Sequence, residues 1–475
     1  MGIFGLFLGL LLIWAIGMAF VVALPRRTPL LSAAGGLAWT AGSGAFAGAF
    51  LATIWMRALS LAGVSFGIAS IFVPLLLLGA ALTWPGLRRE LPELGGALRD
   101  AADIVRGRQL QGMARVLWLA LLAWLALRFA LLFAEVAWQP LYPWDSWTQW
   151  GTKARVWYEL GRLVPFEAAD VWLASNGASY FDAAPHYPGT VPLLQVLASV
   201  ALGRWDDALM NIPFWMLAVA LSCAVYGALR AMDFGPSGAL VGAWLVASLP
   251  LANVHVALAG YADLPLAAFF TVAVLAGLRW LDDRETGDAV LALLLLAACP
   301  LIKVPGRVWL LTLVPALLVA FFPRHGRKLV AAGFAVALFA LLVLARTNPV
   351  ILNYRLHLEF APEWGALADS YFLLGNWHLL WYGAIAAALL GWRQLMSPRL
   401  APFTMVVAAG GVFLFVVFAF TNARAWVADQ TTVNRATLHL APLVTVWMLA
   451  VFRAWVQDRR ALETEEREPM AVRTA

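Results

Sequence analysis

Long apolar runs, interrupted by short polar or proline-containing turns, are the dominant pattern along this chain. A helix that crosses the hydrocarbon core of a bilayer needs about 20 mainly apolar residues. The pattern therefore predicts an all-α, polytopic integral membrane protein with about 13 transmembrane helices. The predicted spans are 3–24, 31–55, 60–84, 116–136, 208–229, 238–257, 264–280, 288–302, 306–322, 329–345, 371–391, 400–420 and 437–454.

The composition supports this fold class and excludes several functions. Hydrophobic residues make up 63% of the chain and charged residues 13%, whereas soluble domains average about 45–50% and about 25%. The net charge of +6 does not indicate nucleic-acid binding, because the basic residues stand at the ends of apolar runs, where they set membrane orientation. Cys223 and Cys299 lie in apolar runs, so neither a disulfide framework nor a zinc site is predicted. Gly42, Gly44 and Gly48 lie inside an apolar run without a preceding strand and predict close helix packing, not a nucleotide-binding loop.

The positions of the basic residues also predict the orientation. The first apolar run has no basic residue before it and Arg26-Arg27 after it, which is typical of an uncleaved span with its N-terminus outside. The Arg-rich connections that follow then fall on the cytoplasmic side. The predicted outward segments are the loop 137–190, the turns 260–263 and 303–307, and the loops 346–370 and 421–436. We therefore expect a multi-pass inner-membrane protein whose polar candidates all face the periplasm.

The chain is expected to have three parts. Residues 1–115 hold three N-terminal spans and a basic cytoplasmic segment, residues 116–455 form the core that carries the site, and residues 456–475 form a disordered cytoplasmic tail. The basic segment mixes arginines with acids, which is typical of a solvated surface helix on the lipid headgroups. Within the core, Val191–Leu202 is too short to span and predicts an interfacial or re-entrant helix that closes the large loop.

The polar residues of the outward segments form the candidate site. They are the carboxylates Asp145, Asp182 and Asp263, the bases Lys153, Arg155, Lys303, Arg307 and Arg435, and the ring-bearing pair His186 and Tyr187. An ionisable group at membrane depth costs about 2.5–3.5 kcal/mol on insertion scales, so its presence near a span end indicates a function. Structural alternatives exist for each kind of residue. They are a helix cap for Asp263, an interfacial aromatic belt around Asp145, headgroup contacts or snorkelling for the bases, and a loop-stabilising role for His186.

These residues, in this order, resemble the membrane-embedded GT-C glycosyltransferases, the superfamily that contains the protein O-mannosyltransferases and the aminoarabinose transferases acting on lipid A. The family pattern has an acidic residue just after a span, a loop with interfacial helices, a proline-containing motif that opens a short helix, and a second acidic residue in the next outward turn. The matching residues are Trp144-Asp145-Ser146-Trp147, Lys153-Ala154-Arg155, Trp157-Tyr158-Glu159-Leu160, Pro185-His186-Tyr187-Pro188, Pro192-Leu193-Leu194-Gln195, Gly260-Tyr261-Ala262-Asp263-Leu264-Pro265, Lys303, Asn434-Arg435 and Leu438-His439-Leu440-Ala441-Pro442. The resemblance covers residues 116–455.

The resemblance implies an inverting glycosyltransferase that takes a sugar from a polyprenyl-phosphate donor to a hydroxyl of a lipid, glycan or protein acceptor at the outer face of the membrane. It implies that Asp145 is the general base and that Asp263 orients the acceptor or Asp145. The bases implied to hold the donor phosphate are Lys303, Arg307 and Arg435, with Lys153 and Arg155 as further candidates. The loop residues implied to serve the acceptor are Asp182, His186 and Tyr187.

The chain departs from the family pattern in three places. It has Asp145-Ser146 where members often have two adjacent acids, Lys303-Val304-Pro305 where they often have a lysine closely followed by a glutamate, and three additional spans at its N-terminus. A divalent metal is therefore compatible with the resemblance but not required. Two other functions stay open at this point. A transporter or flippase of a lipid-linked sugar would place charged residues along both halves of a pathway, and a polysaccharide polymerase or ligase would usually carry one large, late outward loop.

Overall fold

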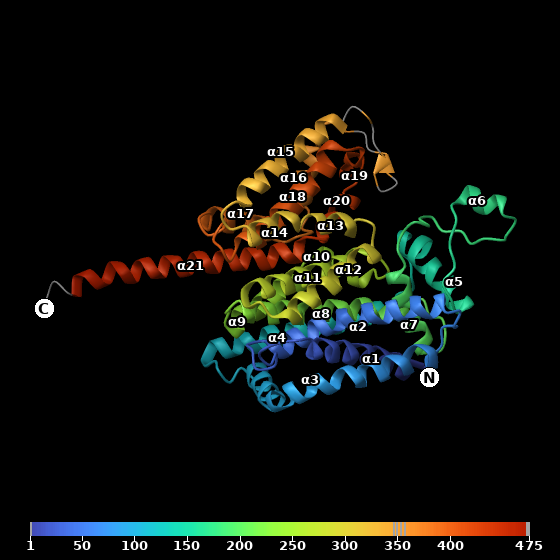
Figure 1. The fold of residues 1–475 in the computed structure, drawn as a ribbon, viewed down its shortest axis with the longest axis horizontal. Helices are drawn as coiled ribbons and strands as arrows, with labels where there is room; N and C mark the ends of the chain where they lie inside the picture. The colour runs from blue at the N-terminus through green and yellow to red at the C-terminus, as the bar shows by residue number, and fades with distance from the viewer. Residues whose placement is uncertain (1, 345–346, 348–349, 352–353, 356–357, 472–475) are drawn as a thin grey trace. The chain divides into compact units, whose positions relative to one another are not determined.

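A computed structural model of the protein describes residues 2–344, 347, 350–351, 354–355 and 358–471. Most of the described residues are helical, and the strands among them form one two-stranded pair (Figure 1). The chain folds into two compact units, Met1–Val308 and Trp309–Ala475, and each is described by itself. The part of the predicted outward loop 346–370 that is absent from the ranges above lies outside the described residues.

The first unit is a bundle of helices with a polar excursion between α4 and α7. Its helices are α1 (Gly2–Ala23), α2 (Gly36–Leu61), α3 (Ile68–Val105), α4 (Gly112–Trp138), the π-helix η1 (Ser146–Gly151), α5 (Thr152–Leu160), α6 (Ala169–Ala174), α7 (Thr190–Leu202), the 3-10 helix η2 (Leu209–Asn211), α8 (Ile212–Ala231), α9 (Pro236–Ala247), α10 (Pro250–Ala257), α11 (Asp263–Asp283) and α12 (Thr286–Ile302). The helix α13 (Gly306–Leu311) runs across the boundary between the units.

The second unit contains the remaining helices and the strand pair. Its elements are α14 (Val314–Phe321), α15 (Gly326–Leu344), β1 (Val350–Ile351), β2 (Tyr354–Arg355), α16 (Trp364–Ala368), the π-helix η3 (Asp369–Leu373), α17 (Leu380–Leu390), α18 (Ala401–Phe420), the 3-10 helix η4 (Asn422–Arg424), α19 (Ala425–Ala428), α20 (Thr431–Leu438) and α21 (Ala441–Ala471). The strands pair antiparallel, with Val350 opposite Arg355. The helix α21 continues through most of the tail 456–475, for which the sequence predicts disorder.

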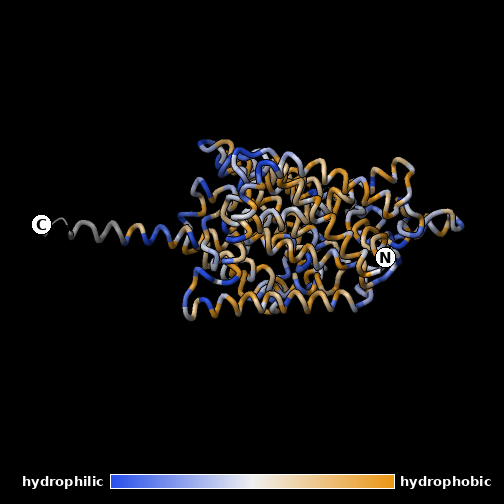
Figure 2. The backbone as a smooth tube through the Cα atoms, turned by 90° about the horizontal axis from the view of Figure 1, so that it is seen from below, coloured by the Kyte–Doolittle hydropathy of each residue, from blue (hydrophilic) through white to orange (hydrophobic). Residues whose placement is uncertain are grey.

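The fold is that of a multi-pass, all-helical membrane protein. Among the described residues, eight helices are long and apolar enough to cross a membrane, or up to ten if each of two bent pairs is one span. The bent pairs are α9 with α10, at 60°, and α20 with the first part of α21, at 53°. Figure 2 shows that hydrophilic stretches gather mostly at the ends of the helices, with apolar stretches between them, which is the pattern that a bilayer requires.

The predicted number of 13 spans is not confirmed. Every predicted span contains helix, but 288–302, 306–322 and 371–391 correspond to apolar helices of only 10–17 residues. A straight helix of 17 residues rises about 26 Å, which is less than the hydrocarbon thickness of about 30 Å. These three segments therefore stay predicted spans, and the coarser conclusion of a polytopic helical membrane protein holds.

Small residues bring α2 close to both α1 and α8, as the sequence predicts for its glycines. A Cβ added at Gly17 of α1 would lie 1.8 Å from the carbonyl oxygen of Gly44, and one added at Gly42 would lie 2.3 Å from the backbone nitrogen of Ala224 in α8. Without a side chain at these positions the backbones pack directly against each other, which is how membrane helices gain contact energy. The packing interpretation of these glycines is confirmed.

The short helix α7 lies inside the first unit and is buried on all of its faces. All 13 of its residues are buried, and it contacts α1, α2, α5 and α8. A helix that lay in the headgroup layer would leave one face uncovered by protein. The interfacial alternative for Val191–Leu202 is therefore wrong, and a short helix enclosed by protein, as in the re-entrant alternative, fits the structure.

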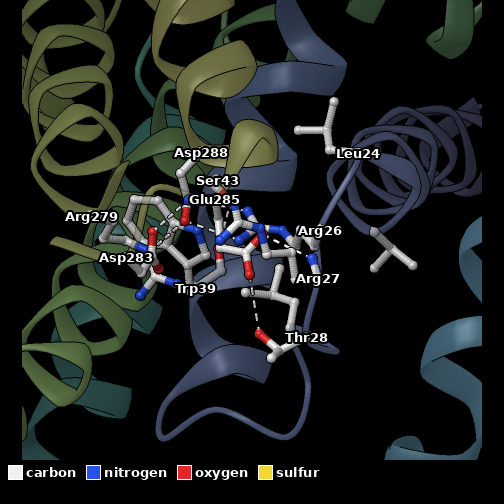
Figure 3. Close-up of polar contacts among 12 residues, drawn as sticks. Leu24, Arg26, Arg27, Thr28, Trp39, Ser43, Arg279, Asp283, Glu285 and Asp288 are labelled. Carbon is white, nitrogen blue, oxygen red and sulfur yellow. Dashed lines mark hydrogen bonds and ion pairs between the residues drawn. The ribbon is translucent and has the colours of Figure 1, made fainter. Parts of the chain in front are cut away.

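The three N-terminal helices are built into the first unit by a network of buried charges (Figure 3). The guanidinium of Arg26, just after α1, donates to both oxygens of Asp288 in α12, at 2.9 and 2.6 Å. Arg279 of α11 lies 3.5 Å from the same carboxylate and 4.9 Å from the ring of Trp39 in α2. Glu285 accepts a hydrogen bond from the backbone nitrogen of Arg27 at 2.9 Å. Residues 1–115 thus share one compact unit with residues 116–308.

Candidate functional site

The loop that carries Asp145 is held by local hydrogen bonds at the end of α4. The backbone nitrogens of Ser146 and Trp147 both donate to the carbonyl of Pro143, at 2.9 and 3.2 Å, and this turn starts the π-helix η1. Asp145 precedes η1 and is half-buried, while Trp144 and Trp147 stack edge to face and are exposed. Single-turn π segments are frequent at functional sites, and this one orients the residues that follow Asp145.

Asp263 and Lys303 form a buried ion pair at a place where two helices end. Asp263 starts α11, and Lys303 is the extended residue that follows α12. The Lys303 ammonium lies 2.5 Å from Asp263 Oδ1, and the Asp263 side chain has no exposed surface. The turn after Lys303 needs a glycine, because a Cβ at Gly306 would lie 2.1 Å from the carbonyl oxygen of Cys299. Arg307, one turn farther on, is exposed.

The Asp145 loop packs directly against the turn that carries Asp263. A Cβ added at Gly260 would lie 2.8 Å from both Cβ and Oγ of Ser146, and Gly260 has a φ of +105° that side chains rarely adopt. Ser146 is fully buried, and its hydroxyl has no hydrogen-bond partner among the described residues. Two acidic segments far apart in the sequence therefore meet in the first unit, and Gly260 sets how closely they approach.

Lys153 holds the large polar loop 137–190 in place. Its side chain is 1% exposed, donates to the carbonyls of Ala184 and Tyr187 at 2.7 and 3.3 Å, and lies 3.2 Å from Asp182 Oδ1. An ammonium has three protons, and these three acceptors match them. These contacts give Lys153 and Asp182 a structural role, and the phosphate-binding role expected for Lys153 and the acceptor role expected for Asp182 stay predictions.

Burial disfavours the charged forms of Lys153 and Asp182, and the attraction between the two groups favours them. Desolvation lowers the pKa of Lys153 and raises the pKa of Asp182, and in each case the attraction of the partner acts in the opposite direction. Desolvation and the Lys153 ammonium also lower the pKa of His186, so its imidazole is neutral near pH 7. His186 is exposed and lies against Tyr187, with ring centroids 4.9 Å apart.

Arg155 belongs to another face of the same helix. It is exposed, pairs with Glu159 at 2.6 Å and lies over the ring of Trp205, 5.0 Å from its centroid. Residues two apart on a helix point in nearly opposite directions, so Lys153 and Arg155 do not converge on one phosphate. A phosphate-binding or headgroup-binding role for Arg155 stays a prediction.

Replacing Lys153 with Met should destabilise the protein by about 3–5 kcal/mol, because it leaves the buried Asp182 carboxylate without its cation. We expect a lower thermal midpoint and faster proteolysis within residues 161–189. Arg155→Met, which breaks an exposed pair, is the matched control and should change stability by at most about 0.5 kcal/mol. Equal effects of the two variants would contradict the fastening role of Lys153.

The second unit carries Arg435 on α20, next to a kink. Arg435 is half-buried, and the neighbouring Asn434 donates to the carbonyl of Gln430 at 2.6 Å. At the kink, the indole of Trp309 donates to Nδ1 of the buried His439 at 3.1 Å. This hydrogen bond places the proton of a neutral His439 ring on Nε2.

An apolar groove of about 550 Å³ lies within the second unit, between α16, α17, α18 and the start of α21. Its walls include Trp364, Tyr371, Trp381, Phe415, Leu440 and Trp447. At one point the wall is polar, where the hydroxyls of Tyr371 and Thr437 lie 2.9 Å apart. Thr437 stands two residues after Arg435 on α20. The helix that carries the polar point of the wall therefore also carries a basic side chain.

Sequence reasoning did not find several residues that shape the first-unit site. Ser146 and Gly260 form the contact between the two acidic segments, and the buried His255 of α10 has its ring 5.3 Å from that of Tyr261. The only sequence signals were a histidine within an apolar span and a glycine before the Tyr261-Ala262-Asp263 turn. Neither signal specifies which segment lies opposite.

Comparison with known proteins adds no relative to this description. The chain matches no protein-family model, no curated protein and no solved structure. Among the described residues, no group of three or more His, Cys, Asp or Glu side chains is arranged to hold a metal ion.

Proposed function

We propose that the protein is an inverting glycosyltransferase that moves a sugar from a polyprenyl-phosphate donor to an acceptor hydroxyl at the periplasmic face of the inner membrane. The observation that carries this proposal is the contact of the Asp145 loop with the turn of the Asp263–Lys303 pair. The contact brings the segment of the half-buried Asp145 against the turn that leads to Asp263, a buried carboxylate whose charge is balanced by Lys303. Such environments push two carboxylates toward different roles.

In the proposed reaction Asp145 takes the proton of the acceptor hydroxyl while the acceptor oxygen forms a bond to the anomeric carbon. The bond between that carbon and the phosphate oxygen breaks, and its electron pair leaves with the polyprenyl phosphate. General-base assistance of this kind contributes about 10²–10⁴-fold. The phosphate gains one negative charge as it leaves, so nearby guanidinium groups stabilise the transition state more than the ground state.

The ion pair changes which bases serve the phosphate in this proposal. Lys303 is bound to Asp263, so we assign it to holding that carboxylate in place. Arg307, which is exposed in the first unit, is the proposed phosphate ligand there, and a phosphate-binding role for Arg435 of the second unit stays a prediction. The planar fork of arginine suits two phosphate oxygens at once.

The apolar groove of the second unit is the proposed site of the polyprenyl chain. Its walls are almost entirely aliphatic and aromatic, which suits a branched hydrocarbon without polar groups. Burying each methylene of such a chain contributes about 0.8 kcal/mol. A groove of this composition is less suited to a sugar, which would need hydrogen-bond partners along its walls.

The direct test is to incubate the purified protein with radiolabelled polyprenyl-phosphate sugars and to measure release of polyprenyl phosphate. We expect one donor to lose its sugar in the parent protein. Reconstituted vesicles distinguish the transporter alternative, in which labelled donor would cross the bilayer with its sugar attached. If no donor were cleaved and one crossed the membrane, the enzymatic proposal would be wrong.

Gly411→Leu should raise the KM for a long-chain donor roughly tenfold to hundredfold, by displacing two to four methylenes from the groove. Gly411 lines the groove, and a Cβ there meets no atom within 4 Å, so the substitution fills space without a clash. A donor analogue with a short, soluble chain should be almost unaffected. Gly333→Leu on α15, where a Cβ also meets nothing, is the control. If Gly333→Leu raised the KM as much as Gly411→Leu, or if Gly411→Leu raised the KM of the short-chain analogue equally, the groove would not be the polyprenyl site.

A further inference from the structure

The C-terminal half of α3 presents a row of apolar side chains that no part of the described protein covers. Leu77, Trp84, Leu91, Leu98 and Val105 recur at every seventh residue and are each 52–65% exposed. Residues seven apart lie on the same face of a helix. The first two belong to the membrane-spanning part of α3, residues 68–86, and the other three continue the same row beyond it.

Both ends of residues 87–105 are fixed where helices leave the membrane. The first end follows the span that closes at Gly86, and the second leads within seven residues to α4, another span. Figure 1 shows that α3 changes direction in its C-terminal half, and Pro85 and Pro92 stand in this region, where proline commonly bends a helix. A helix of 19 residues is about 28 Å long, so one tied to the bilayer at both ends lies along its surface.

Internal contacts hold residues 87–105 against the bundle and show which face of the helix is not covered by protein. The Glu90 carboxylate accepts from the backbone nitrogens of Leu30 and Leu31, both at 2.9 Å. At the other end Ile104 packs against the cluster around Trp118, whose indole donates to the carbonyl of Val105 at 3.3 Å. These contacts occupy the inner face, so the row of Leu91, Leu98 and Val105 faces away from the protein.

Basic side chains border the apolar row. The exposed arginines of the segment and its connection to α4 are Arg88, Arg99, Arg106, Arg108 and Arg115. Arg88 lies over the ring of Trp84, 4.9 Å from its centroid, and a tryptophan topped by an arginine is typical of the headgroup level. Of the four acids in this stretch, Glu90 is buried and Asp103 pairs with Arg108, so positive charge is in excess at the surface.

We infer that residues 87–105 form an in-plane helix that binds the phosphate-bearing headgroups of anionic phospholipids and inserts Leu91, Leu98 and Val105 at the boundary of the acyl chains. The apolar row supplies burial and the arginines supply attraction to anionic lipid, the two terms that hold amphipathic helices on membranes. Each base near an anionic surface adds to this attraction. This assignment is independent of the proposed glycosyltransferase activity and replaces the solvated face expected from the sequence.

Depth of insertion tests the apolar row. Leu98→Cys and Asp100→Cys, each in a Cys223→Ser/Cys299→Ser background, place an environment-sensitive fluorophore on opposite faces at two exposed positions. In nanodiscs of phosphatidylcholine and phosphatidylglycerol, we expect the label at 98 to be quenched by spin-labelled lipid and the label at 100 by aqueous iodide. If iodide quenched the labels at 98 and 100 equally, the face would be solvated. If neither quencher reached the label at 98, a protein partner would cover it. Either result would overturn the inference.

Charge is tested by the double substitution Arg99→Gln/Arg106→Gln. Phosphatidylglycerol added to the protein in detergent should raise the thermal midpoint more than phosphatidylcholine does, and this difference should fall by half or more in the double variant. Arg162→Gln/Arg204→Gln removes the same charge from exposed positions elsewhere in the first unit and should leave the difference unchanged. Equal losses in the two double variants, or no difference between the two lipids, would exclude a specific anionic-lipid surface.

Discussion

Replacing Asp145 with Asn should lower sugar transfer by about 100-fold or more while donor binding stays close to that of the parent. The amide keeps the size of the side chain and most of its hydrogen-bonding capacity but cannot accept the proton of the acceptor hydroxyl. Asp145 is half-buried before η1, so the substitution leaves the packed Ser146–Gly260 contact in place. Initial rates at saturating donor, together with separate binding measurements, distinguish loss of chemistry from loss of affinity.

The control for this substitution is Asp170→Asn, which removes an exposed carboxylate from α6 in the same loop. It should leave transfer within a few-fold of the parent. If Asp145→Asn also stayed within a few-fold, Asp145 would not be the base. Asp182 and Asp263 would then be the remaining candidates, although each is buried and paired with a lysine.

The apolar pattern predicted the class of fold because run length is a direct consequence of bilayer thickness. It also identified α7 as too short to span. It did not show that α3 continues as one helix to Val105 or that α17 is short, because helix ends depend on caps and packing as well as on hydrophobicity. Burial of α7 on all faces depends on its neighbours. The sequence could not predict it, because a helix that is apolar on every side can be covered either by protein or by lipid.

The sequence predicted which residues belong to the candidate site better than it predicted which of them contact each other. Asp263 and Lys303 were both expected to act, but their mutual contact across 40 residues of sequence could not be read from either motif. Lys153 and Arg155 were both phosphate candidates, and their spacing of two residues on one helix already indicates that they do not face the same ligand. The contact of Ser146 with Gly260 depends on the packing of whole helices, which single-sequence patterns do not specify.

Lys303→Met should both abolish most of the transfer and destabilise the protein by about 3–5 kcal/mol, because it leaves the Asp263 carboxylate buried without its cation. The pair is close, at 2.5 Å, and the two side chains are 10% and 0% exposed, so little water is available to replace the lost partner. Thermal unfolding in detergent measures the loss of stability, and transfer is measured on the fraction that remains folded.

The double variant Lys303→Met/Asp263→Asn separates the structural contribution of the pair from its functional one. Removing both charges should restore a large part of the stability, since no unpaired charge stays buried, but transfer should remain low if Asp263 orients the reacting groups. Recovery of both stability and transfer would show that the pair is structural only. A Lys303→Met protein as stable as the parent but with weakened donor binding would instead favour the phosphate-binding role expected from the sequence, because a lysine that contacts donor phosphate can be removed without leaving a buried charge unpaired.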